Sequence, residues 1–277
     1  MAKIFASANQ KGGVGKTTTT VNLAAALAAL SQRVLLVDLD PQGNATMGSG
    51  IDKRSLPTSV YQLLLGLNPL PSVIRPSETG RYDVVPANRE LAGAELDLVE
   101  LERRETRLKA ALAPHLAEYD FVLIDCPPAL SLLTLNGLTA AHGVIIPMQC
   151  EYYALEGLSD LVNTIKQVHR NLNPELEIIG LLRVMFDPRS TLARQVSDQL
   201  EQHFGKKVFK TLVPRNIRLA EAPSYGMPGV VFDKASKGAQ AYVAFAAEML
   251  ERFKPGMSGL HPMPPTITPE PLSEPAS

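Results

Sequence analysis

The sequence predicts a doubly wound α/β fold: a mostly parallel sheet with helices on both faces, forming a single domain. Short apolar runs alternate with segments of helical periodicity along the chain. A glycine-rich segment joins the first run to the first helix, and two other runs end in aspartates. Such βα units build open sheets whose functional loops follow the strands. With 277 residues and 45% hydrophobic content, the chain can bury the core this fold needs.

The expected elements follow from the period of the apolar residues and from the turn residues between them. Strands are expected at residues 4–8, 33–37, 82–86, 121–125, 143–148, 177–185 and 208–213. Helices are expected at 16–30, 60–67, 102–116, 130–140, 155–172, 192–204 and 238–253. The domain is therefore assigned to residues 1–253. Residues 254–277 contain seven prolines and no helical period, which predicts a disordered tail.

The glycine-rich segment reads Lys11-Gly12-Gly13-Val14-Gly15-Lys16-Thr17-Thr18. Its glycines allow backbone N–H groups to converge on an anion at the start of the following helix. A lysine and a threonine in these positions suit the outer phosphates of a nucleotide and Mg²⁺. The common pattern has glycine where Gln10 stands, and an additional lysine, Lys11, opens the segment. Taken alone, Lys11 is best interpreted as a solvated loop residue.

Aspartates close two of the expected strands. Asp38 and Asp40 precede a Pro-Gln-Gly turn, where they could equally form local hydrogen bonds or face a ligand. Asp125 ends an apolar strand in the manner of a Walker B carboxylate, which holds Mg²⁺. Its pairing with a phosphate loop upstream strengthens that interpretation.

Composition limits the alternatives. The formal net charge of −1 gives no general sign of a nucleic-acid or membrane protein. The longest apolar run, residues 23–30, is too short to span a bilayer, and the first strand begins too early to leave room for a signal peptide. Cys126 and Cys150 flank apolar strands, so reduced buried thiols are expected. A cytoplasmic protein is predicted.

With these motifs assembled, the chain resembles the ParA/Soj family of deviant Walker ATPases, which partition bacterial chromosomes and plasmids. Two further stretches carry the resemblance, Gln149-Cys150-Glu151-Tyr152-Tyr153-Ala154-Leu155-Glu156-Gly157 and the segment from Val213 to Ser224. The likeness covers residues 2–253. It implies ATP and Mg²⁺ as cofactors, an ATP-dependent homodimer, nonspecific binding to the double-stranded DNA of the nucleoid, and a ParB-type centromere-binding partner that stimulates hydrolysis.

The resemblance also implies roles for individual residues. Lys11 would reach the nucleotide of a partner subunit, and Lys16 the β- and γ-phosphates. Asp40 would orient the attacking water near the metal, supported by Asp38. The Mg²⁺ site implied by the family comprises Thr17, Asp40 and Asp125, and the nucleotide-binding set comprises Lys11, Gly12, Gly13, Val14, Gly15, Lys16, Thr17, Thr18, Pro214, Arg215 and Asn216.

DNA contacts are expected from a basic region. Residues 183–237 contain ten Lys or Arg against five Asp or Glu, and the family pattern points to Arg189 and Arg218. Arginines that touch phosphates would give salt-sensitive binding with little sequence preference. Without the resemblance, a solvated basic face would be the better interpretation.

Three other classes share the loop. A MinD-like membrane-cycling ATPase would need an amphipathic basic helix at its end, which the proline-rich residues 263–269 do not favour. A reductase like the nitrogenase iron protein would need two cysteines placed to share a cluster, and neither cysteine is so placed. A metabolic enzyme that uses ATP for phosphate transfer or amide synthesis is disfavoured mildly by the basic region.

Overall fold

The computed structural model describes residues 2–152 and 154–253. One eight-stranded sheet crosses it, with the order β3-β4-β2-β5-β1-β6-β7-β8. The strands are β1 Lys3–Ser7, β2 Val34–Asp38, β3 Arg75–Ser77, β4 Tyr82–Val85, β5 Phe121–Asp125, β6 Gly143–Met148, β7 Glu177–Phe186 and β8 Val208–Pro214. All neighbouring strands are parallel except β3 and β4. The predicted fold class is confirmed.

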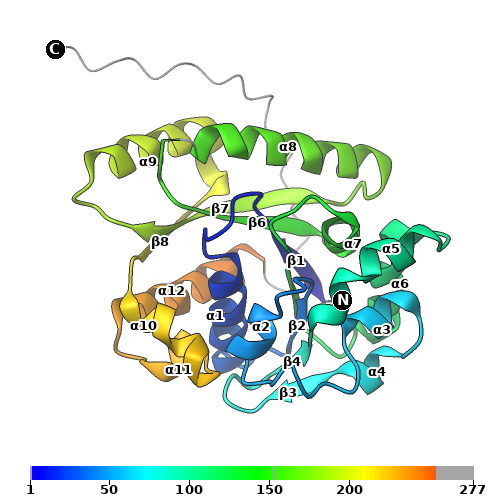
Figure 1. The fold of residues 1–277 in the computed structure, drawn as a ribbon. Helices are drawn as coiled ribbons and strands as arrows, with labels where there is room; N and C mark the ends of the chain where they lie inside the picture. Colours follow the sequence, from blue (N-terminus) through cyan, green and yellow to red (C-terminus); the bar gives the residue numbers. More distant parts are fainter. Residues whose placement is uncertain (1, 153, 254–277) are drawn as a thin grey trace.

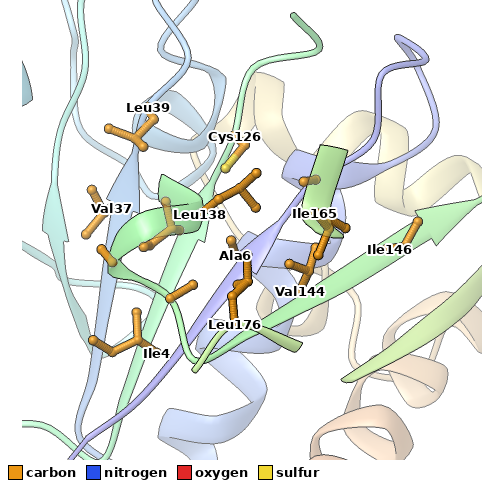
Figure 2. Packing of buried hydrophobic residues seen from close by; sticks show 14 of the residues in the cluster. Ile4, Ala6, Val37, Leu39, Cys126, Leu138, Val144, Ile146, Ile165 and Leu176 are labelled. Atoms are coloured by element: carbon orange, nitrogen blue, oxygen red, sulfur yellow. The ribbon is translucent and has the colours of Figure 1, made fainter. Parts of the chain in front are cut away.

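Helices cover both faces of this sheet (Figure 1). They are α1 Lys16–Ala29, α2 Asn44–Gly48, α3 Val60–Leu65, α4 Leu70–Val73, α5 Ala94–Val99, α6 Arg107–Leu112, α7 Leu132–Ala140, α8 Ala154–Asn171, α9 Thr191–Phe204, α10 Ile217–Glu221, α11 Gly229–Phe232 and α12 Lys237–Arg252. One hydrophobic cluster joins the sheet to α3 to α9, and a second joins it to α1, α11 and α12. Figure 2 shows the first cluster, where Ala6 of β1 lies beside its register partner Val144 of β6.

The central strands are buried along their whole length, which explains their continuous apolar sequence. For this reason most expected boundaries agree with the structure within two residues. The expected helix at 102–116 is wrong as one element: it is split into 3₁₀ turns at Arg104–Thr106 and Ala113–His115 on either side of α6. Arg103 has a positive φ of 54°, and Pro114 lacks the N–H that a continuous helix requires.

Strand order places three loops together. β1 lies between β5 and β6, so the chain changes direction across the sheet at this strand. The carboxyl ends of β1, β2 and β5 are in register, with Ser7 and Asp38 both paired to Asp125. In open α/β sheets this is the position at which ligands bind.

Candidate functional site

The glycine-rich loop connects β1 to α1. Gly13 and Gly15 have φ of 72° and 77°, which L side chains rarely adopt, and Gly15 directly precedes the helix. A Cβ added at Gly13 would meet nothing within 4 Å, so the backbone conformation, not crowding, demands glycine there. The loop thus presents the N-terminus of a long helix to an anion.

The two lysines of the loop differ in environment. Lys16 is only 7% exposed, and its Nζ lies 3.2 Å from the carbonyl oxygen of Lys11. Burial lowers the pKa of Lys16, an effect that the charge of Asp125 opposes. The side chain of Lys11 is half exposed and pairs with Glu151 at 2.5 Å, beyond the end of β6. Lys16 is therefore directed back over the loop, whereas Lys11 extends outward.

Asp125 connects β5 to the start of α1. Its Oδ2 accepts a hydrogen bond of 2.7 Å from Thr17 Oγ1, and its Oδ1 accepts one of 3.0 Å from Thr20 Oγ1. The predicted neighbours Thr17 and Asp125 are thus brought together. Thr20 is a member of this group that motif analysis missed, because the phosphate-loop pattern ends before it.

Asp38 and Asp40 occupy different positions. Asp38 is fully buried and accepts hydrogen bonds from the backbone and hydroxyl of Thr46 and from the backbone of Asp40. It therefore fixes the turn between β2 and α2. Asp40 is partly exposed, and its Oδ1 accepts a local bond from the Gln42 N–H. The carboxylate of Asp40 is consequently the more accessible to a ligand.

Two buried carboxyls lie side by side at the ends of β2 and β5. Burial raises the pKa of Asp125, and the charge of Asp38 raises it further. Burial also raises the pKa of Asp38, although hydrogen bonds from Thr46 oppose this. Negative charge is costly here without a cation.

Oxygen donors from Thr17, Asp125 and the nearby Asp40 form a set that suits Mg²⁺, which takes one or two carboxylates together with substrate phosphates and water. Within residues 2–152 and 154–253, no cluster of three or more His, Cys, Asp or Glu could hold a metal by itself. The donor set therefore fits a metal that arrives with a nucleotide, not a cage made by protein alone.

A cavity of about 420 Å³ adjoins Thr17 and Thr18. Its walls come from α1, α2 and the segment after β8, and include Asn22, Met47, Leu219, Pro223 and Met227. Mixed apolar and amide walls beside a phosphate loop suit the nucleoside part of a nucleotide.

Pro214, Arg215 and Asn216 are not among the residues that line this cavity. Asn216 instead caps α10, its Oδ1 accepting from the backbones of Arg218 and Leu219. The cap holds Leu219 in the cavity wall. The segment from Val213 to Ser224 therefore reaches the cavity, but Leu219 and Pro223 line it, not the expected Pro214, Arg215 and Asn216.

Three residues that sequence reasoning missed support the loop from outside. Gln149 Nε2 lies 3.1 Å from the carbonyl oxygen of Gly13 and 3.0 Å from Met185 Sδ. Asn9 Nδ2 donates to the carbonyl of Pro147 at 2.8 Å. Met185 itself has a positive φ of 51°. For Gln149, the one available signal in the sequence was its place in the stretch from Gln149 to Gly157 that carries the family resemblance.

The two arginines expected to touch DNA lie beyond paired strand ends, since Phe186 of β7 is in register with Pro214 of β8. Arg189 is 88% exposed and forms an ion pair with Asp187. Hydrogen bonds from Arg189 lower the pKa of Asp187 to about 2. Arg218 is 56% exposed and pairs with Glu221 at 2.9 Å and Asp233 at 3.4 Å. Both guanidiniums are accessible.

Both cysteines are buried free thiols, as expected. Burial raises the pKa of Cys126 well above its ordinary value and that of Cys150 to about 11. Neither thiol is poised for metal or redox chemistry. Among the described helices, none has the length and apolar character to span a bilayer. The proline-rich residues 263–269 and the rest of the expected tail lie outside the described residues.

Comparison with known proteins gives a consistent result. A family model described as an AAA domain matches residues 2–178. The chromosome partitioning protein ParA of Myxococcus xanthus is 50% identical over 255 residues, covering 92% of this chain and 90% of that protein. The sporulation initiation inhibitor protein Soj of Bacillus subtilis is 51% identical over 249 residues, covering 90% and 98%.

Among solved structures, a cobyrinic acid a,c-diamide synthase from Mycobacterium smegmatis, with a bound ATP analogue and magnesium, has a TM-score of 0.82 and is 40% identical. The match covers 97% of this chain and 100% of that one. The fold, the glycine-rich loop and the sequence relatives therefore all indicate the same kind of nucleotide-binding α/β protein.

Proposed function

The chain belongs to the ParA/Soj family of chromosome-partitioning ATPases, and on this premise we propose a switch in which ATP builds a DNA-binding homodimer and hydrolysis dissolves it. ATP and Mg²⁺ are the cofactors, in keeping with the ligands of the M. smegmatis structure. One observation carries the proposal: Thr17 and Asp125 lie within 2.7 Å beside a buried lysine and a nucleoside-sized cavity.

The nucleotide would lie along the start of α1. Backbone N–H groups of residues 11–18 would bind its phosphates, with Lys16 on the outer two. Its nucleoside would occupy the cavity between α1, α2 and Leu219. Thr17 and Asp125, with Asp40, would hold Mg²⁺, whose positive charge would offset both the phosphates and the buried carboxyls.

Hydrolysis would depend on positioning and charge neutralisation. Asp40 is the partly exposed carboxylate that follows β2, and we assign it to orient the attacking water. Asp38 would act through Asp40, because its Oδ1 accepts the Asp40 backbone N–H at 3.1 Å.

Dimerisation would involve Lys11. In the single chain this lysine is paired with Glu151, half exposed on the surface. We propose that it exchanges this partner for the phosphates bound by a second subunit. The γ-phosphate then becomes part of the interface, so ATP stabilises the dimer and its hydrolysis removes a contact.

DNA binding is assigned to Arg189 and Arg218. Each pairs with carboxylates of its own chain, and phosphates would compete for the same donors. A dimer doubles the number of such contacts, which would make affinity for nucleoid DNA depend on ATP. A ParB-type protein bound at the centromere would stimulate hydrolysis and release the cytoplasmic form.

The deciding experiment measures binding to nonspecific double-stranded DNA at low salt with ATP, with ADP and without nucleotide. Lys11→Ala and Arg218→Ala should both fail to bind, while Lys109→Ala, an exposed lysine on α6, should bind like the wild type. Of the two variants that fail to bind DNA, Arg218→Ala should still form the ATP-dependent dimer and Lys11→Ala should not.

Absence of DNA binding under every nucleotide condition would reject the partition switch. Nucleotide-dependent binding to anionic vesicles would then favour a MinD-like cycle. ATP consumption that required an amide donor would favour synthesis of the kind implied by the name of the M. smegmatis protein.

A further inference from the structure

A second cavity lies at the opposite edge of the sheet from the nucleotide-binding loop. It has a volume of about 930 Å³ and is bounded by the first residues of β7 and β8, the 3₁₀ turn Gly205–Lys207 and the end of α12. Because β7 and β8 run parallel to β6 and β1, this is the amino-terminal edge, whereas the loop follows the carboxyl end of β1. The volume is in the range of small-molecule sites, roughly 300–1,000 Å³.

One side of this cavity is apolar. Ile179, Phe209 and Phe253 contribute to it, and the ring of Phe253 packs edge-on against Phe5 with centroids 5.2 Å apart. Ile179 and Phe209 are core residues, 6% and 0% exposed. Their anchoring in the core gives a fixed apolar wall on which an alkyl or aryl group could lie.

The other side is mainly basic, although Glu177 and Glu201 also line it, and its two arginines are already engaged. Arg183 donates to Ser197, Glu201 and the carbonyl of Phe209. Arg252 donates to the carbonyl of Lys206 at 2.9 Å and lies over the ring of Phe209. These arginines hold the walls together.

Lys207 is in a different state. Its Nζ is buried, and within the described part of the chain no hydrogen-bond partner for it is found. Burial lowers the pKa of Lys207, opposed by the charge of Glu177. Arg183 Nε, in the same walls, is also buried without a partner among the described residues. A buried ammonium group without a hydrogen-bond acceptor is destabilising, and an anion placed beside it would relieve that cost.

The outermost strand beside this cavity, β8, does not offer a place for an added β-strand. β8 is the last strand of the sheet, and Figure 1 shows it between α9 and α12. The backbone N–H groups of Lys210 and Thr211 already donate to Glu248 on α12. A peptide strand would have to break these bonds, which favours a small molecule as the occupant.

We propose that this cavity binds a small amphipathic anion, with an alkyl or aryl body on the Phe209 and Phe253 side and a carboxylate or phosphate head at Lys207. The apolar wall supplies burial, and the lysine supplies a charge-assisted hydrogen bond. The proposal concerns a site remote from the ATP-binding loop and does not depend on DNA binding.

Calorimetric titration of the full chain tests this, with octyl phosphate, octanoate, octanol and inorganic phosphate, each below its micelle concentration. Octyl phosphate or octanoate should bind one molecule per chain, and the tighter of the two identifies the head group. Octanol and inorganic phosphate should bind at least about tenfold more weakly, since each lacks half of the interaction.

Lys207→Met keeps the apolar stem and removes the charge. It should weaken the anionic ligand by about tenfold or more while leaving octanol unchanged, and Lys207→Arg should restore part of the loss. Lys109→Met is the matched control and should have no effect. ATP should not displace the ligand, and the ATP hydrolysis rate of Lys207→Met should equal that of the wild type.

Three results would overturn the proposal. The first is no saturable binding of either anion to the wild type. The second is equal binding to wild type and Lys207→Met, provided that the variant melts at the wild-type temperature. The third is displacement by ATP, which would place the anion in the nucleotide site.

Discussion

Lys11 Nζ lies 2.5 Å from Glu151 Oε2, so the lysine that opens the phosphate loop is held by a carboxylate of its own chain. The two side chains are 51% and 49% exposed, and the pair links the end of β1 to the residues after β6. Since exposed ion pairs contribute only about 0–1 kcal/mol, this contact can be exchanged at little cost. It competes with any phosphate that Lys11 would bind in a dimer.

Replacing Glu151 by Gln should therefore favour the ATP-bound dimer. Removal of the competing carboxylate frees Lys11 in both subunits, and the energy of one exposed pair corresponds to a gain in dimer affinity of up to about fivefold per subunit. Sedimentation analysis with ATP measures this directly. Lys11→Ala should abolish the dimer in both backgrounds. Unchanged or weaker dimerisation in Glu151→Gln would show that the pair is not a competitor.

Asp125→Asn should separate stability from activity. The folded state raises the pKa of Asp125, so this carboxyl favours the protonated form when folded. Its contribution to the free energy of unfolding is therefore lost as the pH rises above the ordinary carboxyl pKa of about 4 toward neutrality. At pH 8 without Mg²⁺, the neutral amide should make the protein more stable, by about 1–2 kcal/mol.

The same substitution should abolish Mg²⁺-dependent ATP hydrolysis. In the wild type, Mg²⁺ with nucleotide should raise the melting temperature more at pH 8 than at pH 5, because the metal binds the ionised carboxylate. Thermal melts at the two pH values, with and without Mg²⁺ and ADP, test this dependence. A wild-type protein that Mg²⁺ and ADP stabilise equally at both pH values would contradict it.

Much of the fold could be predicted because its central strands are buried on both faces. Continuous apolar runs such as those of β5 and β6 have few alternatives to a covered parallel strand. The short elements could not be predicted in this way. α10 and α11 have five and four residues, and tertiary packing, not periodicity, determines them.

The candidate site also contains residues that the sequence could predict and residues that it could not. Thr17 and Asp125 were predictable because each belongs to a motif whose chemistry requires it. Gln149 and Met185 were not, since their role depends on which strand ends lie beside the loop in space. The ion pairs of Lys11, Arg189 and Arg218 also depend on tertiary position or on local turns that no motif encodes.

Gln149→Glu should weaken nucleotide binding. The amide of Gln149 donates to the carbonyl of Gly13, and a carboxylate of the same shape cannot donate. Loss of one such bond, about 1 kcal/mol, together with repulsion of the phosphates, should raise the dissociation constant for ATP about fivefold or more. Titration with a fluorescent ATP analogue measures it. Gln240→Glu, on the exposed face of α12, is the control, and an equal effect there would exclude a specific role for Gln149.

Glu248→Ala should destabilise the fold at the edge of the sheet. Burial by itself would raise the pKa of Glu248, but hydrogen bonds from the backbones of Lys210 and Thr211 and from the Thr211 hydroxyl, with the charge of Arg252, lower it overall. Because the folded-state pKa is lowered, the stabilisation is present above the ordinary glutamate pKa and is lost as the pH falls below it.

At pH 7, truncation to Ala leaves two backbone N–H groups of β8 without their acceptor and removes the ion pair of Arg252 with Glu248. We expect a loss of about 2–3 kcal/mol in the free energy of unfolding, measured by urea denaturation. Glu251→Ala, about one helical turn further along on the exposed face of α12, should change the free energy of unfolding by less than about 0.5 kcal/mol. The difference between the two variants should shrink toward pH 3, where Glu248 is protonated in the unfolded chain. A constant difference from pH 7 to pH 3 would mean that packing, not the carboxylate, anchors α12 to β8.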